Sequence, residues 1–176
     1  SVICLSDLIE SVRGLYGKQI YFNNDNFKKF ANIKAKTIAE ICSLPTISDD
    51  SGLEVDALGG APGVHSARYA TDGHDFAANN RLLLKNLEGV KERTARFRTV
   101  IALIMDGVEY NFEGRVEGAI AQAESGSEGF GYDPLFVPSG EIITFAQMSA
   151  EAKNAISHRG RAVAELVKFL KVDSEN

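Results

Sequence analysis

Early in the chain the apolar residues follow a helical period. Between residues 26 and 43 they recur about every 3.6 positions, which predicts a helix that Pro45 ends. Lys34 falls inside this stripe, between Phe30 and Ile38, so its ammonium must reach solvent, pair with an acid or face a ligand. The predicted stripe consists of Phe27, Phe30, Ala31, Ile38, Ile41 and Cys42, and the predicted opposite face carries Lys28, Lys29, Asn32, Lys36 and Glu40.

Period-two alternation and turn residues predict the strands. The plainest element is a hairpin, with strands at 95–105 and 108–115 around Asp106-Gly107, a dipeptide that suits a type I′ turn. The other expected segments are a short strand at 44–47, an alternating apolar segment at 53–58, a loop at 59–63 and a strand at 134–137.

Two further helices are expected. One spans residues 75–87, with Gly89 placed to end it, and the other follows Ser157, which can act as its N-cap. Strands interleaved with helices, together with one long hairpin, indicate an α/β fold with a mixed β-sheet.

Composition narrows the class of protein. At 176 residues and 44% hydrophobic content, the chain is expected to form one domain, residues 1–176. A net charge of −5 argues against binding to nucleic acid or to a membrane, and the apolar runs are far shorter than the roughly 20 residues of a membrane span. Cys4 and Cys42 lack metal-ligand spacing and form no disulfide framework, so we expect a cytoplasmic protein.

Adjacent carboxylates in Asp49-Asp50-Ser51-Gly52 are the first candidates for chemistry. At a strand end they point to opposite sides, so the two cannot share one role. An aspartate at a strand end suits the coordination of Mg²⁺ or the activation of an attacking water. The same residues are typical of an Asx-type turn closed by glycine, and spacing alone favours the turn.

A glycine-rich stretch at 125–134 carries two aromatic residues. Glycines let the backbone approach a ligand, Phe130 and Tyr132 offer faces on which a base can stack, and Asp133 can accept hydrogen bonds from ring N–H groups. A long loop with its aromatic residues in the core explains the same composition, so both interpretations stay open.

Cationic and donor groups gather before the last helix. Lys153, His158 and Arg159 lie where helix N–H groups favour an anion. Such a His-Arg pair is more often a surface feature, but Gly160 beside it favours close approach of the backbone to a ligand. Walker, Rossmann and serine-hydrolase motifs are not found in the sequence, which leaves a magnesium-dependent site for a phosphorylated aromatic ligand.

These motifs stand in the order known from one family. Asp49 to Leu58, Gly60 to Ala70, Gly129 to Pro134 and Lys153 to Gly160 closely resemble the inosine/xanthosine triphosphate pyrophosphatase family, and the similarity runs from about Phe27 to Leu170. The resemblance implies an elongated, two-lobed α/β fold around a long twisted mixed sheet with flanking helices, usually a homodimer, with the substrate in the cleft between the lobes. It also implies Mg²⁺-dependent hydrolysis of nonstandard purine nucleoside triphosphates (ITP, dITP, XTP) to the monophosphate and pyrophosphate, which cleanses the nucleotide pool.

The resemblance also implies roles for single residues. Asp50 matches the general base and magnesium ligand, Ser51 a substrate contact, and Lys34 the lysine of a helix motif. The base-recognition loop corresponds to Phe130, Gly131, Tyr132 and Asp133, and Lys153, His158 and Arg159 complete the substrate site. Arg159 and loop N–H donors would favour a 6-oxo purine over adenine, whose amine would face a donor.

The amino end departs from the family pattern. The family opens with a strand, a Ser/Thr-x-Asn-x-x-Lys phosphate loop and a helix, and nothing before Leu5 supplies them, so we expect this segment to be missing from the sequence. Lys29 and Phe30 stand where the family has Glu-Asn, and Asp25 is the acid available near the expected second metal ligand. The alternative to an active enzyme is therefore a catalytically impaired nucleotide-binding homologue that lacks the loop gripping the triphosphate.

Overall fold

The structure is a computed structural model that describes residues 26–173, with side chains through residue 171. Predictions about the amino end, including the phosphate loop and Asp25, fall outside these residues, as does Cys4. The helices are α2 (Asn26–Cys42), α3 (Phe76–Asn86), α4 (Ala150–Ile156) and α5 (His158–Asp173). The strands are β1 (Thr46–Val55), β2 (Pro62–Gly63), β3 (Thr94–Met105), β4 (Val108–Ile120) and β5 (Phe136–Pro138).

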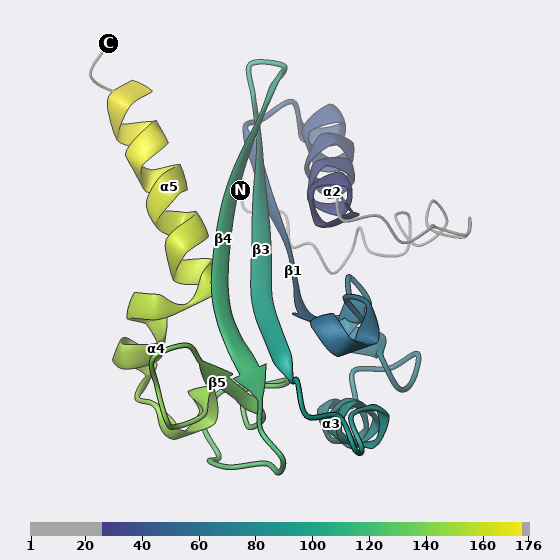
Figure 1. The fold of residues 1–176 in the computed structure, drawn as a ribbon. Helices are drawn as coiled ribbons and strands as arrows, with labels where there is room; N and C mark the ends of the chain where they lie inside the picture. The colour runs from purple at the N-terminus through teal and green to yellow at the C-terminus, as the bar shows by residue number, and fades with distance from the viewer. Residues whose placement is uncertain (1–25, 174–176) are drawn as a thin grey trace.

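A long sheet forms the centre of the molecule, with α2 against one face and α5 against the other (Figure 1). The strand order is β2-β1-β3-β4-β5, and every pairing among the described residues is antiparallel. We expected a mixed sheet, and the parallel pairing that it requires is not found in this part of the chain. The predicted hairpin is confirmed, because Asp106 and Gly107 have φ of 52° and 76°, the two positive values of a type I′ turn.

Alternate residues of β3 pack against the two helices. Val100 and Ala102 face α2, whereas Ile101 and Leu103 face α5, as the period of two in a strand requires. The largest apolar core lies at the end of the sheet away from the hairpin, where α3 and β5 contribute buried side chains (Figure 1). No helix in the described part of the chain is long and apolar enough to cross a bilayer.

Helix α2 has the predicted bounds but a different buried face. The buried face is formed by Phe27, Ala31 and Ala35, and the small side chains at 31 and 35 let the helix lie close to the sheet. Asn32 was expected on the outer face and is buried, with its Nδ2 donating to Glu109. Ile41 was expected in the stripe and is 60% exposed. The predicted faces are therefore wrong at Asn32 and Ile41, because contact with the sheet selects which side of the helix is buried.

Strand β1 runs without a break through the segment in which spacing favoured a turn. Ten residues pair in register with β3, from Thr46 with Ile104 to Val55 with Ala95. The turn interpretation is wrong, because a continuous partner strand satisfies the backbone groups that a turn would otherwise satisfy locally. Gly52 is required for another reason: a Cβ there would lie 2.2 Å from the carbonyl oxygen of Gly63 on β2.

The predicted helix starts are confirmed. Asp75 caps α3 by accepting from the Ala78 N–H at 2.8 Å, and Ser157 Oγ accepts from the Gly160 N–H at 3.1 Å. Gly160 does not need a ligand to explain it, since a Cβ there would lie 2.2 Å from the carbonyl oxygen of Asn154. The interpretation of this glycine as a ligand contact is therefore replaced by close packing where α4, which was not predicted, meets α5.

Candidate active site

Asp50 and Lys34 form an ion pair on the α2 side of β1. The Lys34 Nζ lies 2.9 Å from Asp50 Oδ1 and also donates to the main-chain carbonyl of Asp49. Strand β2 pairs only with Leu53 and Glu54, so within the described ranges the outer edge of β1 next to Asp50 has no partner strand. Pairing with an acid was one of the three expectations for Lys34, and the structure selects it.

The Asp50 carboxylate is half-buried and only partly bonded. Burial raises its pKa, and the Lys34 ammonium opposes that rise without cancelling it. Asp50 Oδ2 is buried and has no hydrogen-bond partner among the described residues. A buried acceptor of this kind is unusual in a folded protein, and it leaves Asp50 able to bind a water or a cation.

The surroundings of Asp50 fit Mg²⁺ only if a substrate supplies further ligands. Mg²⁺ is commonly held by one or two carboxylates, with waters and phosphate oxygens completing its shell. Asp50 Oδ2 is one available oxygen. The described residues contain no group of three or more His, Cys, Asp or Glu side chains that could hold a metal by themselves.

Asp49 points to the other face, as the alternation of side chains along a strand predicts. Its Oδ2 accepts from Ser51 Oγ at 3.2 Å and lies 3.6 Å from Arg159 Nη2. The Ser51 and Thr99 hydroxyls are 2.7 Å apart across β1 and β3. Asp49 thus links two residues that were predicted from separate motifs, Ser51 and Arg159.

Phe130 is the centre of a cationic and aromatic cluster. Its ring is 54% exposed, with Lys153 Nζ 5.1 Å and Arg159 Cζ 5.4 Å from the ring centroid. Asp133 is buried, and its Oδ2 accepts from the Phe130 N–H at 2.8 Å and from Lys153 Nζ at 2.5 Å. Gly129 must be glycine, because its φ is +79° and a Cβ would lie 2.1 Å from Asp133 Oδ2.

Tyr132 does not offer the stacking face that the sequence suggested. The side chain is 4% exposed within the large core, its hydroxyl donates to the Ser66 carbonyl at 2.9 Å, and burial raises its pKa far above the ordinary value. Within this loop, Tyr132 therefore packs in the core as the second interpretation predicted, whereas the Phe130 ring is exposed and offers a face for stacking. Gly131 between them has φ of +63° and turns the chain from one environment to the other.

His158 is buried beside this cluster. Its ring stacks on Phe97, with centroids 4.8 Å apart and planes inclined by 11°. Burial, together with the positive charges of Arg159 and Lys153, lowers its pKa to about 3, so the imidazole is neutral at ordinary pH. His158 Nδ1 is buried and, within the described structure, has no hydrogen-bond partner.

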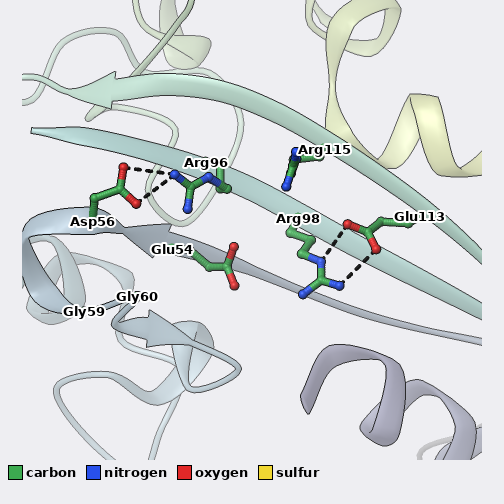
Figure 2. A pocket seen from close by; sticks show the side chains of 8 residues that line it. All are labelled: Glu54, Asp56, Gly59, Gly60, Arg96, Arg98, Glu113 and Arg115. Atoms are coloured by element: carbon green, nitrogen blue, oxygen red, sulfur yellow. Dashed lines mark hydrogen bonds and ion pairs between the residues drawn. The ribbon is translucent and has the colours of Figure 1, made fainter. Parts of the chain in front are cut away.

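A charged hollow of about 470 Å³ on the same side of the sheet as α2 was not predicted (Figure 2). It is lined by Glu54, Asp56, Gly59, Gly60, Arg96, Arg98, Glu113 and Arg115. Arg96 bonds to Asp56, and Arg98 forms two hydrogen bonds with Glu113, so these guanidinium groups are already paired. None of the predicted site residues lines it. The sequence signal for this hollow is the alternation of charged residues along 96–98 and 113–117. These residues can be assigned to one face only when the register of β3 with β4 is known.

Fold and geometry together define a class: an α/β protein with a carboxylate and lysine at one edge of an antiparallel sheet, connected through Asp49 and Arg159 to an aromatic, cationic cluster. Such a combination suits a phosphorylated planar ligand. Comparison with known proteins makes the class specific. A model of the Ham1 family matches residues 8–169, and the chain belongs to the Ham1 family.

Two curated relatives and a solved structure agree with this assignment. The dITP/XTP pyrophosphatase of Porphyromonas gingivalis is 52% identical over 147 residues, which cover 83% of this chain and 76% of that protein. The dITP/XTP pyrophosphatase of Listeria monocytogenes is 51% identical, with coverage of 82% and 72%. The structure of the Staphylococcus aureus Ham1 protein superposes with a TM-score of 0.85 at 38% identity, covering 98% of this chain and 88% of that one. The family resemblance and the α/β class expected from the motifs are confirmed.

Proposed function

We propose that this chain hydrolyses nonstandard purine nucleoside triphosphates (ITP, dITP, XTP) to the nucleoside monophosphate and pyrophosphate, and so removes deaminated bases from the nucleotide pool. The observation that carries the proposal is the half-buried Asp50 carboxylate, paired with Lys34 on one oxygen and uncommitted on the other. Relatives about half identical to this chain bear the name dITP/XTP pyrophosphatase, which supports the substrate class.

At the phosphate end, Asp50 acts as the general base. It accepts a proton from the water whose oxygen bonds to the α-phosphorus, while the bond from that phosphorus to the bridging oxygen breaks and pyrophosphate leaves. Its raised pKa makes Asp50 a stronger base than an ordinary aspartate. The Lys34 ammonium lies beside the same carboxylate and neutralises phosphate charge, and Ser51 contacts the substrate. Mg²⁺, when bound through Asp50, would stabilise charge on the phosphate oxygens.

At the base end, the exposed Phe130 ring provides a stacking face, and Lys153 and Arg159 provide donors beside it. A 6-oxo purine accepts hydrogen bonds from these donors, whereas the adenine 6-amino group would place one donor against another. Neutral His158 has an uncommitted, buried Nδ1, which gives the site one further hydrogen-bonding atom.

The test is release of pyrophosphate from dITP, XTP and ITP, measured beside dATP and dGTP, with Mg²⁺ and with a chelator. We expect Mg²⁺-dependent turnover of dITP, XTP and ITP and a much lower rate with dATP. Binding of IMP without any turnover would contradict the proposal and support the catalytically impaired homologue. A variant Arg159→Ala that kept the full preference for ITP over ATP would contradict the role of Arg159.

We also propose a homodimer in the cytoplasm. The dimer rests on the family resemblance alone, and the compartment rests on the use of cysteine, with Cys42 a free thiol. Light scattering at micromolar concentration that gave the mass of one chain would contradict the dimer.

A further inference from the structure

The first turn of α3 contacts the loop that carries Phe130. The ring centroids of Phe76 and Phe130 are 6.3 Å apart, with the planes inclined by 43°. One turn further along, Asn80 Nδ2 donates to the carbonyl of Gly131 at 3.2 Å. Phe76 and Asn80 are spaced i, i+4 and so lie on one face of the helix. That face of α3 is therefore a wall of the candidate base site.

Both aromatic rings at this contact face solvent. Phe76 is 42% exposed and Phe130 is 54% exposed, and among the exposed large apolar side chains of the described residues only these two are aromatic. The rest are aliphatic side chains. Two exposed aromatic rings in contact, with Lys153 and Arg159 beside one of them, form a surface suited to a planar ligand that carries oxygen atoms at its edge.

Asn80 adds an independent observation at the same contact. Its side chain is 4% exposed, and its Nδ2 is bonded to the loop. Its Oδ1 is buried without a hydrogen-bond partner in the part of the chain that the structure describes. Asn80 is thus buried although its Oδ1 is unpaired, and its Nδ2 bonds to the loop. The bond to the loop therefore explains why an asparagine stands at this position.

We propose that Phe76 contacts the nucleobase, which stacks across the joint surface of Phe76 and Phe130, and that Asn80 is a positioning residue that holds Gly131 so that this surface is complete. The inference rests on the proposed function, because it takes a purine nucleotide as the ligand. Phe76 and Asn80 lie outside the four motifs that carry the family resemblance, and only the fold brings them to the loop.

The test compares IMP binding by calorimetry in the wild type, Phe76→Ala, Phe76→Trp and Ile41→Ala. We expect Phe76→Ala to raise the Kd of IMP about tenfold or more, because stacking of a base on an aromatic side chain typically contributes that much. Phe76→Trp keeps a ring and is expected to retain affinity. Ile41, which is 60% exposed on α2, gives the control for loss of an exposed apolar side chain. A Kd for Phe76→Ala within twofold of the wild type would overturn the inference.

Steady-state kinetics with ITP separates positioning by Asn80 from a general structural role. Asn80→Ala is expected to raise KM several-fold with kcat nearly unchanged. In the double variant with Phe76→Ala the two effects on KM should be less than multiplicative, because both act through one surface. Fully multiplicative effects, or a loss of kcat instead of affinity, would overturn the positioning role.

The outcomes distinguish this inference from the proposed function. If the wild type binds IMP in a manner that depends on Phe76 but releases no pyrophosphate, the proposed hydrolysis fails and the inference stands. If the wild type hydrolyses dITP and Phe76→Ala changes neither KM nor IMP affinity, the inference fails and the hydrolysis stands. Absence of any purine nucleotide binding would overturn both.

Discussion

Two half-buried carboxylates of β1, Asp50 and Glu54, lie four residues apart and so face the same side of the sheet, yet their surroundings differ. Burial raises the pKa of both side chains. Beside Asp50 there is the single ammonium of Lys34, and one carboxylate oxygen is buried without a described donor. Glu54 lies instead in the charged hollow, where Arg96 and Arg98 bond to other carboxylates (Figure 2).

The difference shows which property of a polar cluster indicates a ligand. The pKa moves in the same direction at Asp50 and Glu54, so that direction alone does not distinguish a catalytic group from a structural one. In the charged hollow, Arg96, Arg98 and Arg115 pair with carboxylates of the fold, so these guanidinium groups have partners without a ligand. In the candidate site, Asp50 Oδ2 and His158 Nδ1 are buried and unpaired. Asn32 on α2 and Asn111 on β4 also have buried amide oxygens without partners in the described structure, so an unpaired atom indicates a ligand only where it lies beside other groups of a site, as Asp50 Oδ2 does beside Lys34.

The largest expected effect comes from replacing Asp50 by its amide, with the same change at Glu54 as the matched control. Asp50→Asn should lower kcat for dITP by about 10³-fold, because loss of a general base typically costs 10²–10⁴-fold. Glu54→Gln, on the same strand and the same face, should leave kcat within about twofold. Equal losses in the two variants would show that burial of a carboxylate on β1, and not its uncommitted oxygen, is what matters.

A smaller effect is expected from Lys34→Met, and it is best seen as a change with pH. Under the proposed mechanism, activity requires ionised Asp50, so it should fall as the pH drops through the raised pKa of that group. Lys34 is the main influence that lowers the Asp50 pKa, so removing it should move the acidic limb of kcat/KM to higher pH. At neutral pH we expect a loss of about 10–100-fold.

Lys34→Arg keeps a positive charge and serves as the matched control, so its acidic limb should stay close to that of the wild type. An acidic limb that stays in place in Lys34→Met, or that moves to lower pH, would contradict the assignment of the titrating group to Asp50.

Local chemistry in the sequence was sufficient for some of the fold. The hairpin follows from Asp106-Gly107, and the starts of α3 and α5 follow from Asp75 and Ser157, because each of these signals acts within a few residues. Lys34 could be singled out because a charge inside an apolar stripe needs a partner. The identity of that partner, Asp50, required the structure.

The errors arise where distant residues decide the outcome. The segment Ser48 to Gly52 has the composition of a turn, but pairing with β3, about 50 residues away, makes it a strand. Tyr132 and Phe130 lie two residues apart in one loop, and only the packing of the large core places the first inside and the second outside. Phe76 could not be predicted as a site residue for the same reason, because only the fold brings Phe130 beside it.

The smallest expected effect concerns stability and tests whether His158 is neutral. In the folded protein its pKa is lowered to about 3, whereas the ordinary value is 6.5, so between these values the unfolded chain binds a proton that the folded chain does not. The free energy of unfolding should therefore fall as the pH is lowered through 6.5, by about 2 kcal/mol between pH 7 and pH 5 from this group.

His158→Phe keeps a ring to stack on Phe97 and cannot titrate. Urea denaturation at several pH values should therefore show that the free energy of unfolding changes less with pH in this variant, by that amount. A slope that is unchanged in His158→Phe would mean that the imidazole accepts a proton in the folded protein. His158 would then no longer stand beside Asp50 as a buried group of the candidate site without a partner.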